Sequence, residues 1–200
     1  MPALHRPLRP TVTVDFQGEA AMISSDNSNL TRFFTGLCEN VFESRLGIAD
    51  PPLVDYVSDL MVRFVRFDTL TRVRSPSGLP MHEVVDMLTE AESRVGIARR
   101  EVHRHIGDVT LFWTGVYPEA LPALKRAANK DFFVNYCEQG KRAYYIASTI
   151  QTDRQEDAAS EVLERLSHEF EMCAYGLGEV RREGERRDED GDGQRPLIIK

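Results

Sequence analysis

Two acids, an imidazole and the chain's only tryptophan stand close together in the middle of the sequence. Glu101 and His105 are four residues apart, and Asp108 and Trp113 follow them. Polar groups of this kind can form a small ligand pocket when they meet on an apolar wall at one helix junction. Tyr144, on a later helix, could add a hydroxyl group. We predict these five residues as a candidate ligand-binding site.

The same residues also have a purely structural interpretation, which we prefer. His105 would hydrogen-bond to Glu101 or to a backbone group, and Asp108 would only cap a helix. The junction would then stabilise the fold without binding anything. Neither interpretation assigns a catalytic residue.

The sequence lacks the motifs that are typical of common catalytic and metal sites. It contains no GxSxG, no Walker loop, no HExxH and no GxGxxG after a strand. The stretch DEDGDG starts like a calcium loop, but Ile199 stands where the loop needs glutamate. Glu164 and His168 are four residues apart, whereas di-iron bundles use Glu-x-x-His. We therefore expect no metal and no cofactor, and we favour a protein that is not an enzyme.

Length and composition indicate one domain of moderate size. The 200 residues are 42% hydrophobic, which is enough for a core. A net charge of −7 argues against nucleic acid or an anionic membrane as a partner. No apolar run approaches the roughly 18 residues of a membrane span. Three cysteines without a CxxC pair fit buried thiols, so we expect a cytoplasmic protein.

The residues that must position the candidate site form the segment GDVTLFWTGVYPEAL, 107–121. Gly107 suits the end of one helix and Asp108 suits the N-cap of the next. The apolar residues that follow point in all directions, which is typical of a buried helix. We predict a short central helix at 108–117, with Trp113 buried and Gly115 touching another helix near Gly140.

Apolar residues recur at intervals of three and four in the rest of the chain, which predicts further helices. We expect an all-α, bundle-like domain of about six or seven helices. Their predicted ranges are 28–46, 51–68, 80–106, 118–128, 131–151 and 155–183. Arg99, Arg100 and Arg104 would lie at the end of the helix 80–106, where the helix dipole favours cations.

The helix predicted at 155–183 carries the most regular apolar pattern. Its apolar residues follow a heptad-like spacing that fits either a long bundle helix or a homo-oligomer seam at 159–180. The residues of this seam are Ala159, Leu163, Leu166, Phe170, Cys173, Leu177 and Val180. We prefer the bundle helix.

Composition also divides the chain into three parts. We expect a weakly ordered segment at 1–26, the helical domain at 27–183 and a disordered charged tail at 184–200.

Three segments resemble a family of bacterial helical proteins found in planctomycete-like genomes. They are RHIGDVTLFWTGVYPEAL (104–121), QGKRAYYIAS (139–148) and LSHEFEMCAYGL (166–177), and the first contains the pattern GD-x-x-LFWTGVYPE. The resemblance implies a bacterial helical domain with dispensable ends, and it assigns no activity and no site residues.

Two functional hypotheses follow from the sequence. The first is a non-catalytic helical binding or scaffold protein, with an unknown protein partner or a second copy of itself. The alternative is a small-ligand-binding protein or an enzyme, with a polar pocket where the helix 80–106 meets the central helix.

Overall fold

The computed structural model describes the backbone of residues 16–65, 83–124, 131, 134–152 and 158–189, and the side chains of residues 28–64, 83–122, 131, 134–152 and 158–187. All regular elements within these ranges are helical, which confirms the predicted all-α class. Their order is α1 (Phe16–Glu39), a π-helix (Asn40–Arg45), α2 (Pro51–Val65), α3 (Val84–Ser93), α4 (Gly96–Gly115), a 3-10 turn (Pro118–Ala120), α5 (Leu121–Leu124), α6 (Tyr136–Thr149), α7 (Ser160–His168) and α8 (Phe170–Glu189).

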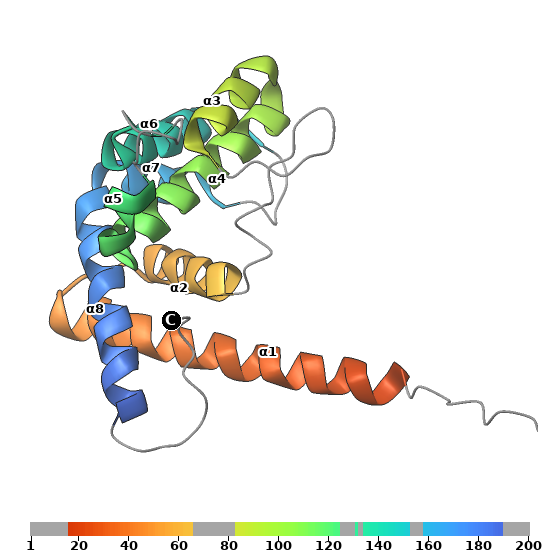
Figure 1. Cartoon of the computed structure of the whole chain (residues 1–200), viewed down its shortest axis with the longest axis vertical. Coiled ribbons are helices and arrows are strands. Elements are labelled where there is room, and N and C mark those ends of the chain that lie inside the picture. The colour runs from red at the N-terminus through yellow and green to blue at the C-terminus, as the bar shows by residue number, and fades with distance from the viewer. Residues whose placement is uncertain (1–15, 66–82, 125–130, 132–133, 153–157, 190–200) are drawn as a thin grey trace, which may run out of the picture.

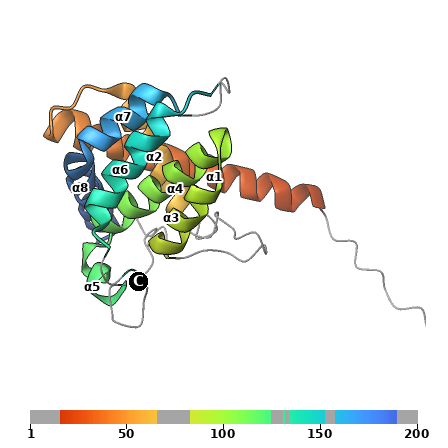
Figure 2. The ribbon, with the colours of Figure 1, turned by 90° about the horizontal axis from the view of Figure 1, so that it is seen from above.

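The helix α4 runs through the middle of the fold. Helices α2, α3, α6 and α8 all pack against it, and α7 packs against α6 (Figures 1 and 2). The second half of α4 is buried on nearly every side, as the apolar pattern after Asp108 predicted. This central helix therefore holds the candidate site residues 101–113 among the helices that pack against it.

The predicted junction at Gly107 and Asp108 is wrong, because α4 passes through both residues without a break. A Cβ atom at Gly107 would lie 2.6 Å from the Cε1 atom of Tyr144, so this glycine makes room for an aromatic ring instead of ending a helix. Asp108 accepts hydrogen bonds from side chains of other helices, so it caps nothing. The predicted short helix at 108–117 is the second half of a longer one.

The real break lies earlier, at Arg94 and Val95, and it divides the predicted helix 80–106 into α3 and α4. Gly96 begins α4 with a φ of 56°, a left-handed conformation that glycine adopts at little cost. Arg99 and Arg100 therefore lie near the start of a helix. The predicted explanation of these arginines by the dipole of a helix C-terminus is wrong.

The long helix predicted at 155–183 is divided at Glu169 into α7 and α8. Six of the seven seam residues, from Leu163 to Val180, are completely buried in the chain's own core, while Ala159 is exposed. A homo-oligomer through this seam would require the core to open, so we no longer propose one. The bundle-helix interpretation agrees with this placement.

The predicted contact of Gly115 with another helix is confirmed, but its neighbour is different. A Cβ atom at Gly115 would lie 2.8 Å from the carbonyl oxygen of Ala174, on α8. Gly140 instead faces Phe170 and Thr110. Trp113 is half-buried at the edge of the core, so its predicted burial is only partial.

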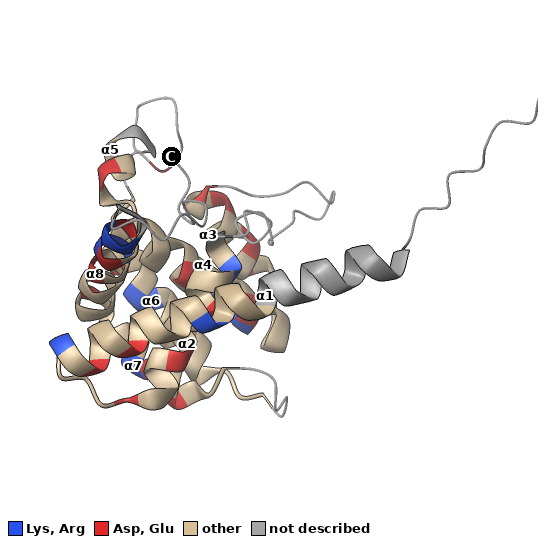
Figure 3. Ribbon diagram, turned by 90° about the horizontal axis from the view of Figure 1, so that it is seen from below, with Lys and Arg blue, Asp and Glu red and all other residues tan. Residues whose placement is uncertain are grey.

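Helical structure also extends past both predicted domain boundaries. Helix α1 begins at Phe16, and its N-terminal part projects beyond the other helices in Figure 1. Helix α8 continues to Glu189, with Arg–Glu pairs such as Arg186–Glu183 along it, and Figure 3 shows both signs of charge on this helix. Residues 1–15 and 190–200, where we predict weak order, lie outside the described part of the chain.

Candidate functional site

A buried carboxylate lies at the centre of the candidate site. Asp108 is only 4% exposed, and its Oδ1 atom accepts hydrogen bonds from the hydroxyl groups of Tyr56 at 2.6 Å and Tyr144 at 2.8 Å. Its Oδ2 atom accepts a charged hydrogen bond from Nη2 of Arg63 at 3.2 Å. We call these four residues the Asp108 cluster. They join α2, α4 and α6.

The electrostatics of the Asp108 cluster hold each group in its hydrogen-bonding form. Burial and the neighbouring Asp108 charge raise the pKa of both tyrosines above the ordinary value, so both hydroxyl groups keep their protons as donors. Burial opposes the charged form of Arg63, but Asp108 and the tyrosines outweigh it and raise the pKa of this arginine. Its guanidinium group also lies 5.4 Å from the centre of the Tyr56 ring, within cation–π range.

Glu101 and Arg104 lie beside the cluster on the same face of α4. Nη2 of Arg104 donates to Oε2 of Glu101 at 2.8 Å. Burial lowers the pKa of Arg104, but Tyr56, Asp108 and Glu101 raise it overall, which agrees with a position next to the cluster. Oε1 of Glu101 and Nε of Arg104 are buried and have no hydrogen-bond partner within the described ranges. The two side chains therefore make one hydrogen bond to each other, and each keeps one buried polar atom without a partner among the described residues.

The other two predicted site residues lie outside the cluster. His105 is buried and stacks on Phe64 of α2, with ring centres 6.3 Å apart. Trp113 packs against Phe112 and Tyr117 towards the end of α4. The structure thus joins Asp108 to Tyr144, places Glu101 next to them, and leaves His105 and Trp113 in separate aromatic contacts.

The sequence analysis missed Tyr56 and Arg63. The two residues are seven apart on α2, which places them on one face of the helix, with Tyr56 in the predicted apolar stripe. An arginine at that spacing beside a buried stripe is the signal that could have indicated a carboxylate on the helix packed against it. Nothing in the local sequence says which carboxylate.

This arrangement leaves Asp108 little capacity for proton transfer or metal binding. The carboxylate is buried, and three of its roughly four lone-pair positions already accept hydrogen bonds, so a substrate or an ion has little access to it. Across the described residues there is no group of three or more histidine, cysteine, aspartate or glutamate side chains that could hold a metal ion. None of the described helices has both the length and the apolar character to cross a membrane.

Comparison of the chain with protein-family models, curated proteins and solved structures finds no match. The resemblance to the bacterial helical family therefore depends on the three quoted segments alone. The function has to be inferred from the fold and the site.

Proposed function

We propose that the protein is a non-catalytic helical domain that binds another protein or acts as a scaffold. The observation that supports this is the closed bonding of Asp108, whose two oxygens are occupied by Tyr56, Tyr144 and Arg63. A general base must lie within reach of its substrate, whereas this carboxylate is buried among the side chains that donate to it. A carboxylate that joins three helices instead fixes how they pack.

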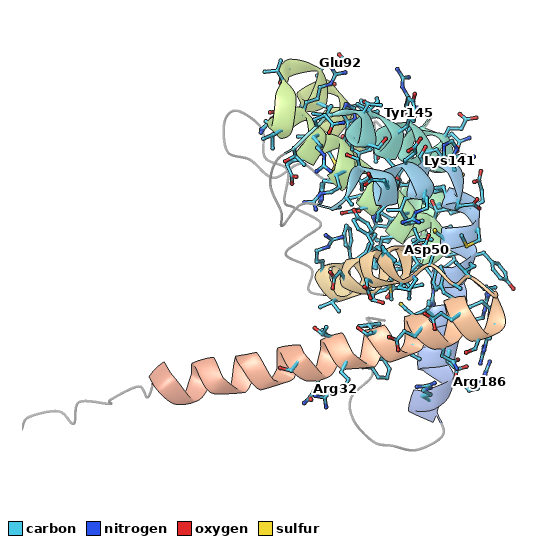
Figure 4. The ribbon with its side chains drawn as sticks, turned by 180° about the vertical axis from the view of Figure 1, so that it is seen from behind. Arg32, Asp50, Glu92, Lys141, Tyr145 and Arg186 are labelled. Atoms are coloured by element: carbon cyan, nitrogen blue, oxygen red, sulfur yellow. The ribbon has the colours of Figure 1, made fainter. Side chains whose placement is uncertain are left out.

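The binding surface that we propose is the outer face of α6 and α8. Tyr145 and Tyr175 are about half exposed, at 52% and 57%, on the helix turns that follow Lys141 and Glu171. Lys141 and Glu171 connect the two helices by an ion pair at 2.8 Å, and each exposed tyrosine lies one turn beyond one member of this pair. Figure 4 shows Tyr145 and Lys141 on the same outward side of α6. Exposed tyrosines are typical of protein interfaces.

A cytoplasmic location and a bacterial origin are part of this proposal. All three cysteines are free thiols, and Cys38 and Cys173 are buried, which supports a reducing compartment. The origin depends on the resemblance alone.

A small-ligand site is the second candidate function, and one observation favours it. The unsatisfied atoms of Glu101 and Arg104 offer one acceptor and one donor beside the Asp108 cluster. Buried polar atoms without partners are uncommon, and a polar ligand that entered there could satisfy both.

Native mass spectrometry of the full chain, purified from the cells that make it, tests both candidates. We expect the chain to retain a bound protein partner, and we expect the double variant Tyr145→Ser with Tyr175→Ser to lose it. The partner should remain with Val95→Ser, which changes an exposed apolar residue between α3 and α4. A retained small molecule that Glu101→Gln releases would instead favour the ligand site. A partner that survives the two tyrosine substitutions would contradict the proposed surface.

A further inference from the structure

His103 is a buried histidine that the Asp108 cluster does not use. It is only 5% exposed, and neither ring nitrogen has a hydrogen-bond partner in the described part of the chain. An imidazole always carries at least one N–H donor, and its neutral form also carries an acceptor. A buried group of this kind is rare and needs a physical explanation.

The position of His103 places it where α4 meets α6. Gly107 faces Tyr144, and Thr110 faces Gly140, so the two helices run in opposite directions along their contact. Continuing this register by one turn brings His103 opposite the end of α6, where Ala147 and Ser148 are buried. This end of the interface is buried, and Glu138, the carboxylate of α6, lies in the first turn at the opposite end of that helix.

The charged groups around His103 oppose its protonation. Arg99, one turn earlier on α4, and Arg142 on α6 both act on the ring. Several carboxylates on or near α4 are already paired with arginines. These pairs are Glu90 with Arg94, Glu101 with Arg104, Asp108 with Arg63, and Glu119 with Arg181. The charges that act on the ring from the described residues are those of Arg99 and Arg142, so a protonated His103 would be a third positive charge beside them.

We propose that His103 makes the contact between α4 and α6 acid-sensitive, because protonation places a further cation beside Arg99 and Arg142 in this buried interface and releases α6 from α4. The inference concerns how the fold opens, so it does not depend on the proposed binding function. The same chain would hold α6 firmly at neutral pH and loosely in an acidic environment.

The sign and the size of the effect follow from proton linkage. Burial, together with Arg99 and Arg142, lowers the pKa of His103 from 6.5 to about 4. In the open state the pKa of the His103 imidazole returns to its ordinary value of 6.5. Because the open state then binds a proton more readily than the closed state, opening is favoured as the pH falls below 6.5. The equilibrium constant for opening should rise about 30-fold between pH 8 and pH 5.

Hydrogen exchange of the full chain at pH 8 and pH 5, corrected for intrinsic exchange rates, tests the proposal. We expect the protection of α6 amides to fall about 30-fold, with a smaller fall in α2. This fall should disappear in His103→Leu and persist in His168→Leu, which changes an exposed histidine on α7. Equal falls in α2 and α6, or the same fall in His103→Leu, would overturn the proposal.

A second measurement keeps the proposal testable if His103→Leu does not fold. The imidazole of His103 in the unchanged chain can be titrated by NMR. A midpoint below pH 5 is expected for a ring held neutral between the two helices. A midpoint at or above 6.5 would show that the folded interface accepts the cation, and it would overturn the inference.

Discussion

Two buried aspartates in this chain have similar tyrosine partners but different structural roles. Asp108 is 4% exposed and Asp131 is 1% exposed, and each accepts a hydrogen bond from a tyrosine hydroxyl group. Asp108 sits in the middle of a helix and joins side chains from three helices. Asp131 lies outside the regular helices and accepts the backbone N–H groups of Val84 and Val85, at 2.9 and 3.0 Å.

Asp131 therefore has the role of a helix cap, which the sequence pattern predicted for Asp108. It caps α3 from a position far along the chain, while Glu83, the local N-cap residue, makes no side-chain cap bond. The N-terminal N–H groups of a helix need an acceptor, and any carboxylate that the fold brings there can supply it. The difference shows that a residue's role depends on which donors surround it in the fold, more than on its neighbours in the sequence.

The largest expected effect comes from Asp108→Asn. This change leaves the guanidinium group of Arg63, which is only 26% exposed, without its counter-charge, and it replaces one acceptor oxygen of the cluster by an amide donor. Breaking a buried pair in this way typically costs about 3–5 kcal/mol. Urea unfolding measures the loss.

The double variant Asp108→Asn with Arg63→Met is the control for this prediction. It should recover part of the stability, because it removes the unpaired charge as well. If Asp108→Asn costs less than about 1 kcal/mol, the cluster does not hold the helices together and the contrast with Asp131 disappears.

A smaller effect is expected from Asp131→Ala. Two backbone N–H groups and the hydroxyl group of Tyr136 lose their acceptor, which should cost about 2–3 kcal/mol in total. The damage should be local, because the N–H groups belong to the first turn of α3. Hydrogen exchange should show lost protection in α3 and little change in α6. Equal loss in both helices would mean that Asp131, like Asp108, supports the whole fold.

The same contrast explains how much could be predicted from the sequence. Periodic apolar residues identified the all-α class, because periodicity reports the buried face of a helix directly, and the prolines that follow Asp50 marked the start of α2 at Pro51. Local signals at Gly107 and Asp108 predicted a helix end that the packing of Tyr144 overrides. Nothing local marks the division at Glu169, which has neither glycine nor proline beside it.

The candidate site was predicted in part for a similar reason. Asp108, Tyr144 and Glu101 were found because polar residues in an apolar stretch stand out in a sequence. Tyr56 and Arg63 come from another helix, and only the crossing of α2 over α4 brings them to Asp108. Such contacts between distant segments leave no mark in local sequence patterns.

The smallest effects are expected from removing single tyrosine hydroxyl groups, and these sharpen the comparison most. Tyr56→Phe and Tyr136→Phe each delete one donor to a buried carboxylate, at 2.6 and 2.7 Å, and each keeps the ring. Either change should cost about 1–2 kcal/mol in urea unfolding, because the remaining donors still hold the carboxylate.

The two sites should differ when a second donor is removed. Tyr56 and Tyr144 share the Oδ1 atom of Asp108, so losing both leaves that oxygen buried without any of its observed donors. Tyr56→Phe with Tyr144→Phe should therefore cost more than the sum of the single changes. Asp131 has only one tyrosine donor among the described residues, and it keeps its two backbone donors in Tyr136→Phe. The cost at Asp131 should therefore stay at that of the single change. Additive costs at Asp108 would mean that water reaches Oδ1 and replaces the lost donors, and the cluster would then be more open than its burial indicates.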